Sequence, residues 1–160
     1  MRFGRLGAEL KHGYNAMTTR ESDMLMDIGY QLMDENEVVE FEDVLQETAF
    51  VILTGDVEVH WDGKKEIMHR TSLFDEAPYC LHVPRGKKVV LKALKGSTVL
   101  VQKTENERDF APVFYRPADI QSPVFGSGMW YRTAERTVRT IFDYENAPYS
   151  NMVNGEVVNT

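Results

Sequence analysis

The chain has 160 residues, of which 42% are hydrophobic, 27% charged and 11% aromatic, which is the usage of an ordinary globular protein rather than of a disordered or fibrous one. It carries 18 Lys and Arg residues against 25 Asp and Glu residues, a formal net charge of −7. A chain this acidic lacks the basic surface that nucleic-acid phosphates or anionic lipids attract, so neither a nucleic acid nor a membrane is expected as a partner.

A single cysteine, Cys80, excludes an internal disulfide and supplies neither a zinc cluster nor a redox pair. The longest unbroken apolar run, residues 49–53, is far shorter than the roughly 20 residues of a membrane-spanning helix. Residues 1–13 lack the apolar centre of a secretory signal. These features predict a protein that works in the reducing cytoplasm.

Residues 1–24 show no sustained period and are expected to form an irregular arm. Short segments rich in Val, Leu, Ile and aromatic residues follow, and they predict β-strands at 28–33, 38–41, 48–53, 57–61, 66–69, 79–83, 89–94 and 97–101. After the alternating strand 57–61, Asp62-Gly63 predicts a type I′ hairpin. Turn residues recur every 8–12 residues or so, Gly55-Asp56 among them, which favours an all-β antiparallel sandwich or barrel.

A charge run at residues 104–109 ends this pattern, and two more strands are expected at 138–142 and 152–158. The chain then stops in mid-pattern. We therefore predict an N-terminal barrel over residues 1–110, a linker over 111–136, and the start of a truncated second domain over 137–160.

Few side chains are candidates for catalysis or metal binding, and each of them can also be explained by a structural or solvent-exposed role. The four histidines have no HxH or HxxxH spacing; they are His12, His60, His69 and His82. Glu40 and Glu42 point the same way on one expected strand, and Glu47 lies on the next. Such carboxylates can hold Mg²⁺ or Mn²⁺ or act as an acid/base pair, but more often they form a solvated face.

A basic cluster of Arg132, Arg136 and Arg139 is able to bind a carboxylate or phosphate, although mixed surface charge explains it as well. Gly126-Ser127-Gly128 begins like a phosphate loop, but Tyr131 occupies the position of the third glycine. No GxSxG nucleophile motif is present in the sequence. The residues alone identify no catalytic, cofactor-binding or metal-binding group.

Several segments together resemble the N-terminal half of the 5-deoxy-glucuronate isomerases of myo-inositol catabolism, relatives of the 5-keto-4-deoxyuronate isomerases. The segments are Ile28-Gly29-Tyr30, residues 47–55, residues 70–75 with Pro78, residues 82–86, residues 136–141, residues 145–148 and residues 155–158. They extend over residues 25–160, and the last two are the most specific.

This resemblance implies a tandem cupin: two jelly-roll barrels in one chain. Cupin metal motifs usually contain HxH, a following Glu and Gly, and then PxGxxH. At the matching positions this chain has Glu40 and Glu42 for the histidines, Glu47 for the glutamate, Gly55 near the glycine, and Val89 for the last histidine. The resemblance therefore implies no metal in this barrel. It implies a divalent metal in a C-terminal cupin, whose motif would follow residue 160.

Two hypotheses follow. The first is the N-terminal cupin domain of a sugar-acid aldose–ketose isomerase, inactive alone because the metal motif is missing, with a sugar acid as substrate of the intact protein. The alternative is a stand-alone, metal-free cupin that binds a sugar acid or a protein without catalysis. Unpaired strand edges next to a missing barrel recruit other strands, so we expect a homo-oligomer in either case.

Overall fold

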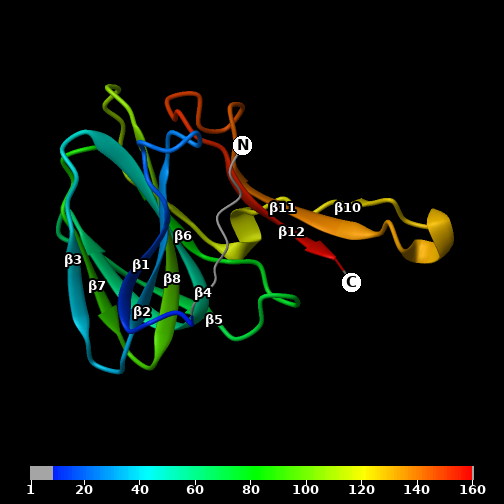
Figure 1. The fold of residues 1–160 in the computed structure, drawn as a ribbon, viewed down its shortest axis with the longest axis horizontal. Helices are drawn as coiled ribbons and strands as arrows, with labels where there is room; N and C mark the ends of the chain where they lie inside the picture. The colour runs from blue at the N-terminus through cyan, green and yellow to red at the C-terminus, as the bar shows by residue number, and fades with distance from the viewer. Residues whose placement is uncertain (1–8, 160) are drawn as a thin grey trace.

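The computed structural model describes residues 9–159 and is built almost wholly from β-strands (Figure 1). The strands of the main body are β1 (Gly13–Thr18), β2 (Asp27–Met33), β3 (Val38–Phe41), β4 (Gln46–Trp61), β5 (Lys64–Arg70), β6 (Cys80–Val83), β7 (Val89–Ala93), β8 (Ser97–Glu105) and β9 (Val113–Tyr115). Within the described residues, the helical segments are two 3₁₀ turns of three residues each, and none has the length and apolar character to cross a bilayer.

Two antiparallel layers arise because the long strand β4 belongs to both. Its first half pairs with β8 and β6, and its second half pairs with β5 and β7. One layer has the order β1-β2-β8-β4-β6-β9, which we call sheet A, and the other has the order β3-β7-β4-β5, which we call sheet B. The strand order is that of a jelly roll, so the all-β prediction is confirmed.

The space between the sheets is filled by apolar side chains. Phe50 and Ile52 enter it from the first half of β4, and Val57, Val59 and Trp61 enter it from the second half. Each of these side chains is at most 5% exposed. The interior is therefore a packed apolar core.

The predicted turn at Gly55-Asp56 is wrong, since the expected strands 48–53 and 57–61 form the single strand β4. Gly55 has φ +107°, and a Cβ there would lie 2.1 Å from Ser97 Oγ. Glycine thus lets the strand pass from one sheet to the other without a turn. The hairpin at Asp62-Gly63 is confirmed, with φ of 45° and 74°.

The prediction of an irregular arm over residues 1–24 is wrong for Gly13–Thr18, which form β1 at the edge of sheet A. Residues 1–8 of that arm lie outside the described residues. β1 forms because its backbone pairs with β2, and its sequence has no clear hydrophobic alternation. None of its side chains is buried, since each is either half-buried or exposed. A strand held by an edge partner leaves little hydrophobic periodicity in the sequence.

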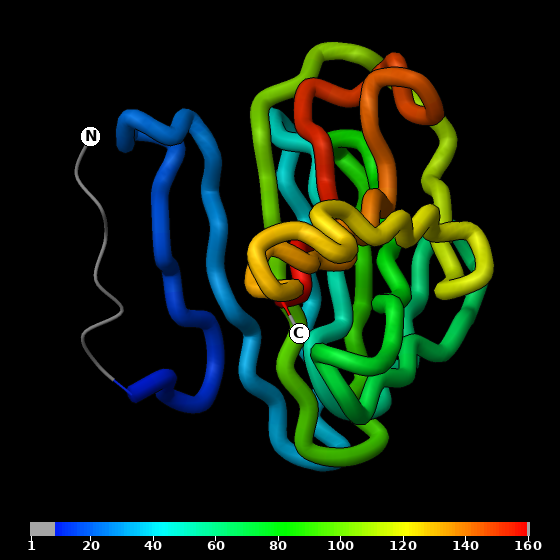
Figure 2. Tube along the Cα trace, turned by 90° about the vertical axis from the view of Figure 1, so that its right-hand side faces the viewer, coloured from blue at the N-terminus to red at the C-terminus, as the bar shows by residue number. Residues whose placement is uncertain are grey.

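The C-terminal strands form a separate three-stranded sheet, from β10 (Val124–Phe125) to β11 (Arg136–Phe142) and β12 (Asn154–Asn159). One end of it lies against sheet A, and the other projects away from the sandwich (Figures 1 and 2). We call the projecting part, residues 124–137, the arm. The predicted boundaries at 110 and 136 stay predictions, although β9 continues sheet A past residue 110 by pairing with β6.

Candidate functional site

The first half of β4 is buried on both faces, and a buried carboxylate, Glu47, lies on its outer face. Ala49 and Val51 point outward and pack against Ile141, Phe142 and Met152. The segment that contains β11 and the following loop thus covers sheet A from outside. Polar side chains caught under this cover must find partners within the protein.

Glu47 is fully buried under the cover and uses both carboxylate oxygens. Its Oε1 accepts hydrogen bonds from Ser150 Oγ at 3.0 Å and from the Asn151 N–H at 2.7 Å. Its Oε2 accepts from Asn106 Nδ2 at 3.0 Å and lies 3.2 Å from His82 Nε2. Burial raises the pKa of Glu47, but these hydrogen bonds outweigh it and hold the pKa below its ordinary value.

His82 is equally buried and stands between aromatic rings. Its ring stacks on Phe142 with centroids 4.3 Å apart, and Phe110 lies 4.7 Å away on centroids. Because an ionised carboxylate only accepts hydrogen bonds, we assign Nε2 as the donor to Glu47, while Nδ1 has no partner among the described residues. A carboxylate and an imidazole are the groups of an acid/base couple. Here, however, the aromatic rings of Phe142 and Phe110 pack against His82, and hydrogen-bond donors occupy both oxygens of Glu47.

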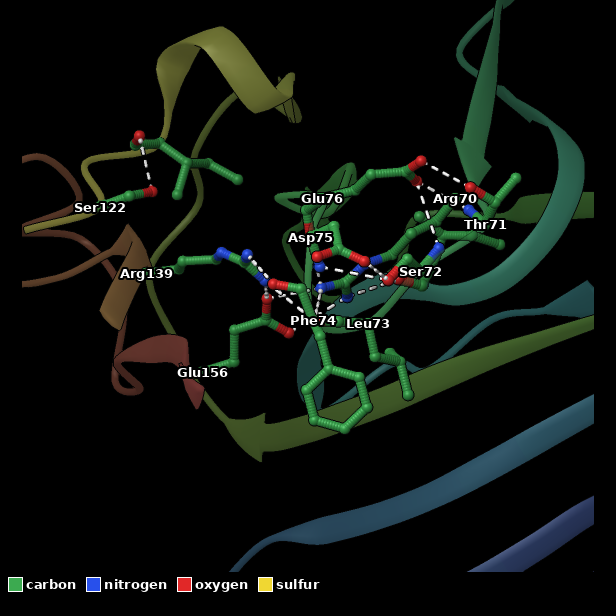
Figure 3. Close-up of polar contacts among 12 residues, drawn as sticks. Arg70, Thr71, Ser72, Leu73, Phe74, Asp75, Glu76, Ser122, Arg139 and Glu156 are labelled. Atoms are coloured by element: carbon green, nitrogen blue, oxygen red, sulfur yellow. Dashed lines mark hydrogen bonds and ion pairs between the residues drawn. The ribbon is translucent and has the colours of Figure 1, made fainter. Parts of the chain in front are cut away.

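A second buried cluster joins β5, β11 and β12 and contains two arginines and one glutamate (Figure 3). Arg70 is fully buried, and its Nη1 and Nη2 donate to Glu156 at 3.1 and 2.5 Å. Arg139 is 6% exposed and donates to Glu156 Oε1 at 2.7 Å. One carboxylate therefore binds two guanidinium groups, and together they join the barrel to the C-terminal sheet.

The surplus positive charge of this cluster is met by backbone carbonyls of residues 71–76. Arg70 donates to the carbonyls of Leu73 and Glu76 at 3.1 and 2.8 Å. Arg139 donates to the carbonyls of Leu73 and Phe74 at 3.0 and 2.6 Å. The cluster fixes this loop, and Figure 3 shows the Phe74 ring pointing away from the guanidinium groups. The Nη atoms of both arginines donate within the protein, whereas Arg70 Nε has no partner among the described residues. The paired Nη groups indicate an anchor between the barrel and the C-terminal sheet.

The three candidate carboxylates do not meet, so the interpretation of a convergent set is wrong. Glu40 and Glu42 are exposed on the outer side of sheet B, because Val39 and Phe41 between them face the core. Lys88 Nζ lies 2.8 Å from Glu40. Glu47 lies under the cover of sheet A instead.

The three candidate arginines are also separated. Arg132 pairs with Glu135 at 3.1 Å, Arg136 lies over the Phe125 ring, and only Arg139 joins the buried cluster. Each histidine contacts a carboxylate, and the partners of His12, His60, His69 and His82 are Glu37, Glu58, Asp56 and Glu47 in that order.

A cupin metal does not fit the interior of this barrel. The core cluster consists of apolar side chains, and Val89, at the position of the last motif histidine, is fully buried among them. Divalent metals need nitrogen, oxygen or sulfur ligands, and none of the cluster's aliphatic and aromatic side chains supplies a ligand set. We therefore derive no chemical step through a metal in this barrel.

The strand order defines the class: a cupin-type jelly roll, here with an apolar interior. The chain belongs to the KduI/IolB family, whose family model matches residues 6–160. That family is associated with isomerases. The comparison with curated protein sequences found no match.

Solved structures show the same fold at low identity. An IolB-like protein from Salmonella typhimurium LT2 has a TM-score of 0.77 and 14% identity, over 86% of this chain and 53% of that one. A putative glyoxylate-induced protein from Pseudomonas aeruginosa has a TM-score of 0.57 and 11% identity, over 76% and 44% of the two chains. This chain thus spans about half the length of these two structures.

Proposed function

We propose that this chain is the N-terminal cupin unit of an aldose–ketose isomerase that acts on a deoxy-uronic acid, and that the unit itself does not catalyse the reaction. Its role is to support and position the polypeptide that does. The observation that carries this proposal is the barrel interior. Apolar side chains, among them Phe50, Ile52 and Trp61, fill the space where a cupin enzyme would hold its substrate.

The chemistry of isomerisation supports this assignment. Moving a proton between adjacent carbons needs a base at the first carbon and an electrophile that stabilises the enediolate oxygen. Glu47 and His82 are the buried groups of suitable type, but both Glu47 oxygens are occupied and His82 is stacked on Phe142. Both side chains are fully buried, so direct contact with a sugar acid requires that the groups covering them move.

The chain's share of the IolB-like structure supports a second functional part in the intact protein, since 53% of that chain is matched. We place the divalent metal and the sugar-acid site in that other part. The Arg70–Glu156–Arg139 cluster and the Glu47 cluster then hold the C-terminal sheet on the barrel, which is the connection that a scaffold needs.

The experiment is a turnover assay on the purified 160-residue chain with 5-deoxy-glucuronate, in the presence of Zn²⁺, Mn²⁺ or Mg²⁺. We expect no aldose–ketose conversion above the buffer rate. A matched sample in which a longer family member supplies the activity serves as the positive control. Turnover by the 160-residue chain that is lost in Glu47→Gln would overturn the proposal and assign catalysis to the buried pair.

The stand-alone binding cupin is the second candidate, and the docked C-terminal segment favours it. Ile141, Phe142 and Met152 cover sheet A as part of one packed unit, although they do not add a strand to it. This candidate requires saturable binding of a sugar acid or a protein by the chain alone. Calorimetry with glucuronate and 5-deoxy-glucuronate separates the two, because the scaffold proposal expects no binding heat.

We also propose that the chain self-associates in the cytoplasm through the arm. Trp130 is 76% exposed and Tyr131 is completely exposed, and Val124, Phe125 and Met129 add to the same projecting segment. Exposed apolar groups gathered on one projection mark an interaction surface. The outer edge of β12 is also free of a partner within residues 9–159, which favours pairing with a second copy.

A further inference from the structure

We propose that His12, Asp34 and Glu37 form a binding site for a divalent transition-metal ion of the zinc class on the outside of the sandwich. Among the described residues, they are the group of three metal-ligating side chains whose ligand atoms all lie within 4.8 Å of one another. One imidazole and two carboxylates form a ligand set that suits Zn²⁺, Co²⁺ or Ni²⁺. The site is remote from the apolar barrel interior and independent of the proposed scaffold role.

Strand pairing brings the three residues together. His12 directly precedes β1, and Asp34 directly follows β2; because Gly13 pairs with Leu32, the two side chains meet at the end of the β1–β2 ladder. His12 Nε2 lies 2.7 Å from Glu37 Oε2 and 3.6 Å from Asp34 Oδ2. The group is thus assembled from the residue before β1 and from the turn between β2 and β3.

The turn that carries both carboxylates is held on each side. The Glu37 N–H donates to the Asp34 carbonyl at 3.1 Å, and the Asp34 N–H donates to Glu37 Oε2 at 2.9 Å. Asn36 and Glu37 also exchange backbone hydrogen bonds with Ala93 of β7, each at 2.9 Å. A ligand pair on a fixed turn loses little conformational freedom when a metal binds.

Comparison with the other two exposed histidine–carboxylate pairs distinguishes this site. Glu58 beside His60 also binds Lys65 at 3.1 Å, and Asp56 beside His69 also binds Lys95 at 2.9 Å. In both pairs an ammonium group already neutralises the carboxylate and would repel a cation. At His12 the third group is a second carboxylate, so the local charge attracts a cation.

The surroundings leave room for the remaining ligands of a metal ion. A cleft of about 310 Å³ is lined by His12 and Asp34 together with Ser97 and Thr98. The side chain of Asp34 is 88% exposed and that of His12 is 58% exposed, so solvent water reaches both. Because the ion would join the start of β1 to the β2–β3 turn, binding should stabilise the edge strand and raise the Tm.

The test is calorimetric titration of the tag-free 160-residue chain with ZnCl₂, together with the visible absorption of bound Co²⁺. We expect one saturable site, and a loss of at least ~10-fold in affinity in His12→Gln and in Asp34→Asn. Asp34→Asn is informative because Asp34 is exposed and its substitution leaves the His12–Glu37 contact in place.

His60→Gln is the matched control, since it removes an equivalent imidazole beside Glu58. It should keep the zinc affinity and the zinc-dependent rise in Tm. No saturable binding to the parent chain, or an equal loss in His60→Gln and His12→Gln, would overturn the proposal. Circular dichroism of each variant confirms that the fold is retained, so a loss of binding is assigned to the ligand itself.

Discussion

The two halves of β4 differ in what covers them, although they form one continuous strand. Residues 46–52 are all buried, whereas residues 55–61 alternate between buried and half-buried positions. In the first half the outer face lies under Ile141, Phe142 and Met152. In the second half the outer face carries Asp56, Glu58 and His60, and no element among residues 9–159 forms a layer over it.

This difference in cover determines how strongly a polar side chain in each half affects the stability of the fold. Glu58 is half-buried and is paired with Lys65 and His60, which reach it from the solvent side, so its contribution to stability is small. Glu47 is fully buried, and it is tolerated because Asn106, Ser150, Asn151 and His82 bind it. The covered half is therefore where substitutions should have large effects.

Removing the cover is the strongest way to test this comparison. Phe142→Ala leaves a cavity beside the first half of β4 and removes the ring stacked on His82, so we expect a loss of about 3–5 kcal/mol in the free energy of unfolding. Urea denaturation measures it. Phe74→Ala, at a side chain that is 67% exposed, is the control and should change stability by less than about 0.5 kcal/mol. Equal effects would show that the cover does not matter.

Breaking the anchor of the C-terminal sheet should have a slightly smaller effect. Glu156→Gln leaves Arg70 and Arg139 buried without an anion, so a loss of about 3 kcal/mol is expected in the same urea experiment. The control is Glu58→Gln on the open half, where the loss should stay below about 1 kcal/mol. If Glu156→Gln falls in the range of the control, the buried cluster is not an anchor.

The buried carboxylate of Glu47 predicts a pH dependence. Its pKa is lower in the folded chain than its ordinary value of 4.5, so its stabilisation is complete above about pH 4.5 and is lost as the pH falls toward the folded pKa. Glu47→Gln should cost about 1–3 kcal/mol at pH 7 and progressively less below pH 4.5. Stability curves from pH 7 to pH 3 test this.

The control for that experiment is Glu42→Gln, at an exposed carboxylate on the open side of the molecule. It should change the free energy of unfolding by less than about 0.5 kcal/mol at each pH. A Glu47→Gln difference that is constant from pH 7 to pH 3 would contradict an ionised, hydrogen-bonded Glu47.

Substitutions in the arm should have the smallest effect on stability, because its large side chains are exposed rather than covered. Replacing Trp130 and Tyr131 by Ser should leave the free energy of unfolding within about 0.5 kcal/mol, because neither side chain is buried. Sedimentation velocity should nevertheless show weaker self-association than in the parent chain. An unchanged association state would exclude these two residues from the contact between copies.

Much of the sandwich could be predicted because alternation along each strand reports directly on a two-layer core. The continuity of β4 could not, since Gly55 has the composition of a turn and its role depends on the approach of Ser97. The unbroken apolar run at residues 49–53 did contain a signal: it marks a strand that is covered on both faces.

The buried polar clusters escaped prediction because their members are distant in sequence. Glu47 and Ser150 are 103 residues apart, and Arg70 and Glu156 are 86 residues apart. A partial signal existed for Arg70, which follows Met68 on the inward-facing side of β5 and is thus a charge at an interior position. Its partner can be found only from the fold.

Cys80 lies at the centre of the covered half, where β6 pairs with β4 and with β9. The side chain is fully buried, and this burial raises the pKa of the thiol far above its ordinary value. A thiol-specific reagent added to the native protein therefore reacts only as fast as sheet A opens. Because Cys80 is the chain's one cysteine, the rate at which the protein gains the mass of the reagent measures the rate of that opening, and no label has to be introduced.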